Sequence, residues 1–439
     1  MKILYKLPFL LLLITPALLS GQKRWSLEEC VRYAWDNNLR IKQQELSIEQ
    51  NENNLAQARL NYIPTLNASL SHSMNWGRSV NVQDLQIVEN KLSQSTSASA
   101  RAAVSVFEGL TKKNEIKSKG VQLDISIQEV ERLKNEISVE IARSYLQILL
   151  SREILKSARL SLKSVEEQLA RAKKFADAGS VAYSTVLEVE AQLASEKFQV
   201  VNAENQLRSS LLNLSNLLDL QSETEFDVED VNVDNLVKDF RGEDIDELYR
   251  QSLSLPQIKS AQLNLDNAGL QLSIAKGRAL PSVTFSAGYG SYYSDSREQG
   301  FFDQFNENRN PSLGFGLNIP IFNNHQIKNS VKNARLGVKS ATYEVRSRQQ
   351  MLYKEISQAN NDAMAYYERF KAAGSNVQAM EESFRYVQQK FDIGILSATD
   401  YTVAKTNLFK AKSDYYQSKY QFVFQLKILD FYKGKPISL

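Results

Sequence analysis

The segment Thr65–Trp76, with the sequence TLNASLSHSMNW, alternates polar and apolar side chains for twelve residues. Its odd positions hold Thr, Asn and Ser, whereas its even positions include Leu66, Leu70 and Met74. A period of two predicts a β-strand with one apolar face. The pattern recurs at three other places, Ser97–Phe107, Ser282–Tyr293 and Ser312–Phe322. Four such strands, each of about ten residues, match the wall of a transmembrane β-barrel.

A soluble antiparallel sheet with one buried face would show the same alternation. Two polar connections, Gly77–Gln94 and Ser294–Asn310, argue against it, because they are longer than most hairpin loops. Aromatic residues also gather towards one end of the strands, where an interfacial girdle is expected: Trp76, Tyr289, Tyr292 and Tyr293. The sequence therefore favours a membrane sheet.

Two long segments, Lys112–Asp177 and Gln326–Asp392, contain no proline and are rich in Glu, Lys, Gln, Ala and Leu. Apolar residues such as Val130, Leu133 and Ile137 recur in them at steps of three and four, which predicts helices. At 1.5 Å per residue, a helix of this length is about 100 Å long. No globular core encloses a rod of that size.

The two halves of the chain repeat, since Phe107 and Phe322 are 215 residues apart, as are Gly179 and Gly394. Each half is predicted to contain a shorter helix, two strands, the long helix, a glycine turn and a returning helix. The shorter helices are expected at Ser26–Tyr62 and Asp244–Ala279, and the returning helices at Ala182–Leu218 and Ala398–Tyr432. A short and a returning helix placed end to end would match the long helix beside them. We divide the mature chain into a first repeat (22–218), an acidic connecting belt with short strands (219–247) and a second repeat (248–439).

The first 21 residues have the pattern of a secretory signal peptide. Lys2 and Lys6 precede the apolar run Leu7–Leu19, and small residues follow it. Gln22 occupies the position where a lipoprotein would carry its acylated cysteine. We therefore expect export without a lipid anchor.

Four strands cannot close a barrel, and an open sheet edge in lipid leaves backbone groups without partners. A membrane sheet of this size therefore requires several copies of the chain. Eight strands from a dimer would be plugged by side chains, whereas twelve from a trimer leave a water-filled lumen. The Ser, Asn and Gly faces would line that lumen.

Composition excludes several classes of function. The 53 Lys and Arg residues nearly balance 50 acids, so we expect no nucleic-acid partner. One cysteine and two histidines leave little material for a metal site or for nucleophilic catalysis. We predict no cofactor and no enzymatic activity.

The order and duplication of these elements resemble the TolC-like outer-membrane efflux family over nearly the whole mature chain. The matching features are Pro64, Pro281, Val104–Gly109 (VSVFEG), Ile319–Asn323 (IPIFN) and Phe391–Gly394 (FDIG). The resemblance implies duplicated long-helix hairpins that form an α-helical barrel, below a β-barrel completed by a homotrimer. It also implies a passive export duct, in a tripartite efflux or type I secretion system, that contacts a periplasmic adaptor protein and an inner-membrane pump. The alternative is a soluble periplasmic coiled-coil scaffold.

The resemblance also implies functions for residues near the two glycine turns. Adaptor docking is expected at the turns and the residues beside them: Gly179, Gly394, Lys174, Lys390 and Phe391. Glycines that simply terminate helices would explain the turns equally well. A pore constriction is implied at Asp400, whose counterpart in the first half is Thr185 with Glu188 one turn later. Asp400 is equally well explained as a helix-start acid.

Overall fold

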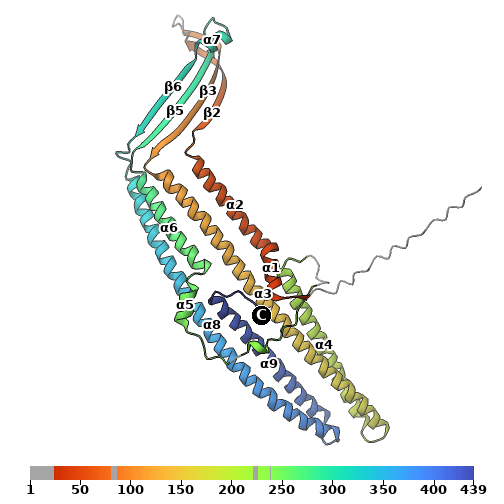
Figure 1. Cartoon of the computed structure of the whole chain (residues 1–439). Helices are drawn as coiled ribbons and strands as arrows, with labels where there is room; N and C mark the ends of the chain where they lie inside the picture. The colour runs from red at the N-terminus through yellow and green to blue at the C-terminus, as the bar shows by residue number, and fades with distance from the viewer. Residues whose placement is uncertain (1–23, 81–86, 221–225, 238) are drawn as a thin grey trace, which may run out of the picture.

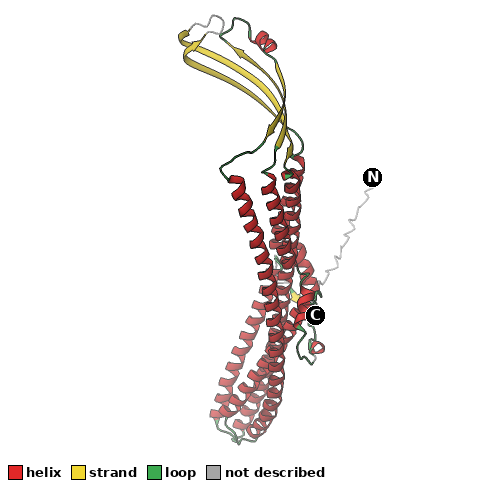
Figure 2. Ribbon diagram, turned by 90° about the vertical axis from the view of Figure 1, so that its left-hand side faces the viewer, coloured by secondary structure: helices red, strands yellow, loops and turns green. Residues whose placement is uncertain are grey.

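The computed structural model describes residues 24–80, 87–220, 226–237 and 239–439. A curved sheet lies at one end and long helices form the rest of the molecule (Figure 1). Seen from the side, the helices make a narrow, gently bent rod, and the sheet at its upper end curves away from the direction of the rod (Figure 2). The predicted signal peptide, residues 1–21, lies outside the described residues.

The sheet contains the four predicted strands in antiparallel order β2-β3-β5-β6. They are β2 (Thr65–Val80), β3 (Ile87–Glu108), β5 (Ser282–Ser294) and β6 (Asn310–Asn318). The predicted loop Gly77–Gln94 is wrong at both of its ends, because residues 77–80 and 87–94 continue the hairpin. Backbone pairing depends little on side-chain polarity where a hairpin is exposed, so a polar stretch extends the strands. Residues 81–86 lie outside the described part.

Two details of the strands differ from the prediction. A bulge between Ser105 and Phe107 leaves Val106 without a paired residue on β5 and places Phe107 opposite Val283. The last strand ends at Asn318 rather than at Phe322. Pro320, which has no backbone N–H to donate, lies just beyond this end.

The long and returning helices agree with the prediction to within one residue at each end. The first half contains α3 (Thr111–Asp177) and α4 (Tyr183–Leu217), and the second contains α8 (Gln326–Asp392) and α9 (Ala398–Tyr432). The shorter helices are each divided in two, as α1 (Leu27–Asn37) with α2 (Leu39–Leu60), and α5 (Ile245–Ser252) with α6 (Pro256–Gly277). Two short helices therefore replace each single helix that was predicted.

At each break, the divided shorter helix meets the end of the returning helix of the same half in a joint. Asn38 has an extended backbone, its Oδ1 accepts from Arg40 N at 3.0 Å, and its Nδ2 donates to Leu217 O at 3.0 Å. In the second half, Ser252 Oγ donates to Tyr432 O at 2.8 Å. A side chain near the break thus satisfies a carbonyl that the returning helix leaves free at its end. These joints produce the end-to-end arrangement expected from the helix lengths.

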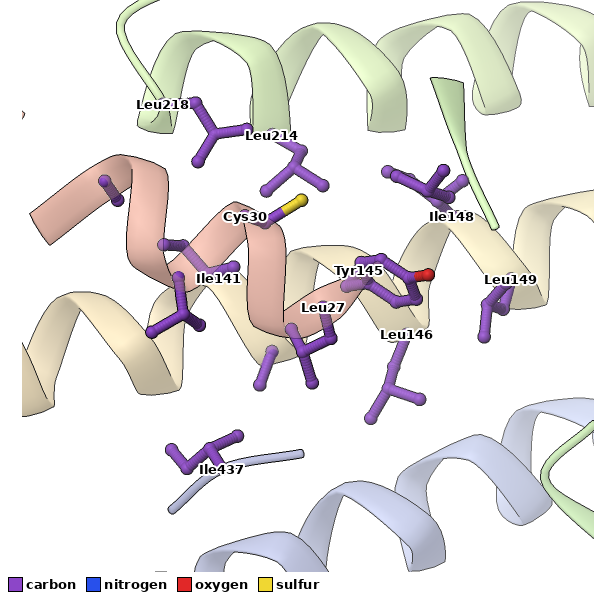
Figure 3. Packing of buried hydrophobic residues seen from close by; sticks show 14 of the residues in the cluster. Leu27, Cys30, Ile141, Tyr145, Leu146, Ile148, Leu149, Leu214, Leu218 and Ile437 are labelled. Carbon is purple, nitrogen blue, oxygen red and sulfur yellow. The ribbon is translucent and has the colours of Figure 1, made fainter. Parts of the chain in front are cut away.

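The largest apolar core surrounds the first joint, where α1, α3 and α4 meet (Figure 3). Ile141, Tyr145 and Ile148 of α3 point towards Cys30 of α1 and Leu214 of α4 (Figure 3). Burial raises the pKa of the Cys30 thiol to about 12. Cys30 is therefore an inert packing residue at neutral pH.

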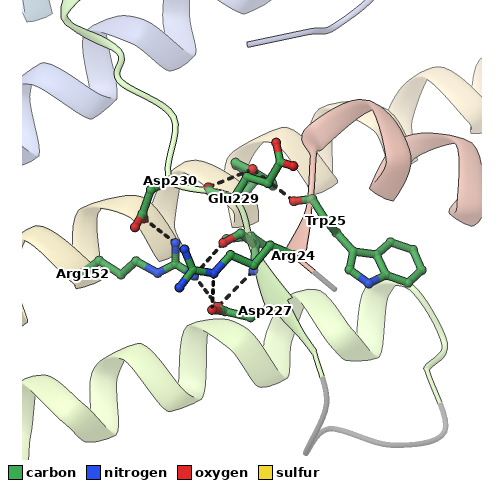
Figure 4. Close-up of polar contacts among 8 residues, drawn as sticks. Arg24, Trp25, Arg152, Asp227, Glu229 and Asp230 are labelled. Atoms are coloured by element: carbon green, nitrogen blue, oxygen red, sulfur yellow. Dashed lines mark hydrogen bonds and ion pairs between the residues drawn. The ribbon is translucent and has the colours of Figure 1, made fainter. Parts of the chain in front are cut away.

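The acidic belt is fastened to the same core. Its strand β4 (Asp227–Val228) pairs in parallel with β1 (Arg24–Trp25), and a 3₁₀ turn, η1 (Asp234–Leu236), follows. Arg152 of α3 contacts the carboxylates of Asp227 and Asp230 and donates to Val228 O at 2.8 Å (Figure 4). In the described part of the belt, β4 and Asp230 are therefore tied to α3 through Arg152.

Candidate functional site

The apolar face of the sheet is exposed along its length. Phe315 of β6 is 79% exposed, although its ring lies 4.9 Å from the ring of Phe285 on the neighbouring strand. Other large apolar side chains share this face and are also exposed: Leu66, Leu70, Leu313 and Leu317. Water does not favour a continuous apolar surface of this kind, which indicates contact with lipid or with another apolar surface.

The opposite face of the sheet is lined by hydroxyl groups. Three cross-strand serine pairs lie at hydrogen-bonding distances of 2.7 to 2.8 Å between their Oγ atoms: Ser69–Ser99, Ser71–Ser97 and Ser73–Ser95. Gly288, Gly314 and Gly316 continue this face on β5 and β6. In the described strands this face is therefore a polar surface of hydroxyl groups and glycines.

Of the four aromatic residues expected in the girdle, Trp76, Tyr289 and Tyr293 lie on the apolar face, whereas Tyr292 lies on the polar one. They do not share one row across the strands. Tyr289 is level with Ala68 of β2 through the pairing with β3, which places it eight residues from Trp76 along the strand direction. Trp76 is 74% exposed, which suits an interfacial residue.

The two helix turns at the far end of the rod have the same geometry. Gly179 has φ +71° and Gly394 has φ +77°, and added Cβ atoms would meet nothing within 4 Å. Ser180 N donates to Phe175 O at 2.8 Å, and Ile395 N donates to Lys390 O at 2.9 Å, as in a Schellman motif. Glycine is needed here for its positive φ and not for space.

The predicted docking residues lie together at this end, although their surroundings differ. Lys174 and Lys390 are exposed. Phe391 is half-buried, because it packs against the small cluster between α3 and α4 and its ring lies 4.7 Å from Tyr401. Large apolar residues beside the turns are open to solvent, among them Ile395 at 72% exposure.

Both predicted constriction acids, Asp400 and Glu188, are exposed on the returning helices. Asp400 takes part in the helix cap of α9. Its N–H donates to Ser397 Oγ at 3.1 Å, and the Ser397 hydroxyl donates to its carboxylate at 2.7 Å. The helix-start explanation therefore accounts for the position of Asp400.

The contact between the two helical hairpins was not predicted from the sequence. Tyr401 is buried between α3, α8 and α9, where its hydroxyl pairs with Gln168 and its ring lies 5.2 Å from Phe384. One turn along α9, Lys405 Nζ donates to Ser161 O at 3.0 Å and lies 3.9 Å from a Glu196 carboxylate oxygen. Charged residues on predicted helices suggest solvated faces, so no local pattern indicated that Lys405 is buried.

We expect Lys405 to make the stability of this contact depend on pH. Its side chain is 8% exposed, and burial lowers its pKa from 10.5 to about 8. Between these pH values the unfolded chain binds more protons than the folded one, so stability rises with pH across this window. Urea unfolding of the detergent-purified protein at a series of pH values measures the effect.

The matched variants for that measurement are Lys405→Met and Lys410→Met. The free energy of unfolding of the native chain is expected to rise relative to that of Lys405→Met as pH rises from about 8 to 10.5, because methionine does not titrate. Lys410 is exposed on the same helix and serves as the control. A difference that stays constant across the window for Lys405→Met would contradict this account.

Comparison with known proteins identifies the family. The model of the outer membrane efflux protein family matches residues 31–219 and 248–434, and the chain belongs to this family. Among curated proteins, outer membrane protein TolC of Vibrio cholerae is 22% identical over 289 residues, covering 65% of this chain and 64% of that protein. TolC of Escherichia coli K12 is 22% identical over 347 residues, covering 75% of this chain and 68% of that protein.

A crystal structure of CusC has the same fold, with a TM-score of 0.77 over 92% of this chain and 91% of the other, at 16% sequence identity. As a family member, this protein is an outer-membrane protein whose helices form a long periplasmic extension. The alignment spans 64% of the length of the Vibrio cholerae relative, which is less than two thirds. Within the described part of the chain, no helix combines the length and apolarity needed to cross a membrane.

Proposed function

We propose that three copies of this chain form an outer-membrane channel that acts as a passive export duct of a tripartite efflux or type I secretion system. The observation that carries this proposal is a four-stranded sheet with one apolar and one hydroxyl-lined face. Its outer strands, β2 and β6, each pair on one side only within the described chain. Pairing β6 of one copy with β2 of the next would satisfy both edges and close twelve strands around the polar faces.

The helical part supports the same proposal. The proposed repeats, 22–218 and 248–439, each contribute one helical hairpin to a curved wall below the sheet, and the described part of the connecting belt, 219–247, contacts α3. Three such walls would enclose a periplasmic tunnel. The apolar face of the sheet does not suit a soluble coiled-coil scaffold, because large side chains such as Phe315 remain exposed on it.

The far end of the rod is the proposed docking place for a periplasmic adaptor, which would connect the duct to an inner-membrane pump. Exposed Lys174 and Lys390 and the apolar Ile395 give this end both charge and apolar surface. Apolar side chains occupy the centre of protein interfaces, and polar side chains lie at the rim. Asp400 and Glu188 remain the proposed constriction residues, since symmetry would repeat each carboxylate three times around the axis.

Single-channel recording in a planar bilayer, with the oligomeric mass measured on the same detergent-purified sample, tests the proposal. We expect stable trimers that conduct ions. A species that stays soluble without detergent and never inserts would overturn the duct and favour the scaffold. Asp400→Ala is then the first variant for the constriction, with Thr185→Ala, its counterpart in the first repeat, as the control.

Ion selectivity of the same channel is expected to depend on Arg101. Arg101 pairs with Asn67 and Gly288 on the polar face, and the strand residues 65–75, 93–105, 284–292 and 310–318 contain no Asp or Glu. Glu108, opposite Ser282 at the helix end of the same face, lies seven residues from Arg101 along β3. Three unpaired guanidinium groups would favour anions in the lumen. Arg101→Gln is expected to shift the reversal potential in a KCl gradient towards cation preference, whereas Asn67→Gln leaves it unchanged. Equal reversal potentials for Arg101→Gln and the native channel would contradict this role.

A further inference from the structure

The connection between β5 and β6 contains a short helix, α7 (Phe301–Glu307), beyond the end of the sheet (Figure 1). Two side chains of β5 hold it in place. Ser291 Oγ donates to Phe305 O at 2.6 Å, and the Tyr293 ring lies 5.0 Å from the Phe301 ring. The helix is therefore attached to β5 through two alternate residues, which project from the same face of the strand.

That face is the apolar one. Ser291 pairs with Ala98, and Tyr293 pairs with Thr96, which pairs in turn with His72. The exposed leucines of β2 and β6 project from this same face of the sheet. The helix α7 is consequently fastened to the apolar side of the sheet and not to the hydroxyl-lined side.

A buried glutamine fixes the orientation of α7. Gln304 is 0% exposed; its Oε1 accepts from Ser294 N at 3.0 Å, and its Nε2 donates to Ser294 O at 3.0 Å and to Gln299 O at 2.8 Å. Asn308 Nδ2 also donates to Tyr292 O at 2.7 Å. This connection is thus held as a small hydrogen-bonded unit that presents α7 in one orientation.

The remaining surface of α7 is divided into an aromatic and an acidic side. Phe301 and Phe305 are one turn apart and stack at 4.7 Å, and Phe302 lies beside them at 5.4 Å from Phe301. Asp303 and Glu307, also one turn apart, form the acidic side. Phe302 is 83% exposed, so the aromatic side ends in a ring that no described residue covers.

We infer that α7 is an interfacial membrane anchor, whose Phe302 inserts into the lipid leaflet at the outer end of the sheet while Asp303 and Glu307 face water. The aromatic side of α7 contacts lipid, because it continues the apolar face of the sheet. The acidic side of α7 faces the water at the membrane surface. This inference rests on the proposed membrane insertion of the sheet. Ser291, a polar residue on that face, has its hydroxyl satisfied by the α7 backbone.

Site-directed spin labelling tests the anchor. Single cysteines replace Phe302, Asp303 or Leu313, and each protein carries a nitroxide and is reconstituted into phosphatidylcholine vesicles. Native Cys30 is fully buried and its thiol is inert, so the unsubstituted chain serves as the labelling blank. Collision with oxygen, which concentrates in hydrocarbon, is compared with collision with a water-soluble nickel chelate.

The expected result is that labels at 302 and 313 collide preferentially with oxygen, and that the chelate-to-oxygen ratio is several-fold higher at 303. Chelate-dominated collisions at 302, with 313 still in lipid, would overturn the anchor alone. Labels at 302 that collide with neither reagent and couple magnetically to one another would also overturn it, since three copies would then meet there. Chelate access at 313 would overturn both the anchor and the membrane insertion of the sheet.

Discussion

Replacing Phe315 by arginine is expected to lower the amount of trimer in the outer membrane. Phe315 lies in the apolar row of β6, opposite Phe285, and its side chain is 79% exposed in the single chain. An arginine on the lipid side of a β-barrel costs about 2 to 4 kcal/mol at the bilayer midplane and about 0 to 1 kcal/mol near the interfaces. A trimer would carry this cost three times. The measurement is the amount of heat-stable trimer in outer-membrane fractions, compared with the native chain.

Asn318→Arg is the matched control for that variant. Asn318 pairs with Ser282 at the end of the same strand but projects from the polar face, which the proposed lumen hydrates. Water solvates an arginine there, so we expect near-native amounts of trimer. Equal losses for the two variants would show that the faces of the sheet are not distinguished by lipid, and would count against membrane insertion.

The faces of the sheet could be predicted from the sequence because side-chain direction alternates along any strand, whatever lies beside it. The bulge at Ser105–Phe107 could not, since it is defined by pairing with β5, more than 170 residues later in the chain. The breaks in the shorter helices were also missed. Asn38 is a moderately poor helix former that looks harmless in a long polar helix, and its side-chain bond to the distant Leu217 O has no local sequence signal.

The candidate site could be predicted only where its geometry is local. Gly179 and Gly394 were found because a tight helix turn requires a positive φ that glycine supplies readily. Tyr401 and Lys405 were missed, since their burial depends on how the second hairpin packs on the first. A tyrosine and a lysine one turn apart give no such signal. The attachment of α7 was missed for the same reason, because Gln304 looks like an ordinary polar loop residue.

Replacing Gly109 by alanine is expected to prevent stable folding of the region where the sheet meets the helices. Gly109 lies between β3 and α3 with φ +58°, and a Cβ there would lie 2.1 Å from Gly277 O, at the end of α6. The contact is mutual, because a Cβ on Gly277 would lie 2.4 Å from Gly109 O. Both neighbours are backbone atoms of long elements, which cannot move aside as a flexible side chain can.

The expected cost of Gly109→Ala exceeds about 3 kcal/mol, since the overlap adds to the penalty of a left-handed backbone in a residue with a side chain. Gly120→Ala is the matched control. Gly120 lies inside α3, a Cβ there would meet nothing within 4 Å, and alanine is about 1 kcal/mol better than glycine in a helix interior. In urea unfolding, Gly109→Ala is expected to lower the free energy of unfolding and Gly120→Ala to raise it. Native-like stability of Gly109→Ala would contradict the close backbone approach. The overlap can be relieved only if β3 and α6 move apart, and the sheet would then no longer be held in one position on the helices.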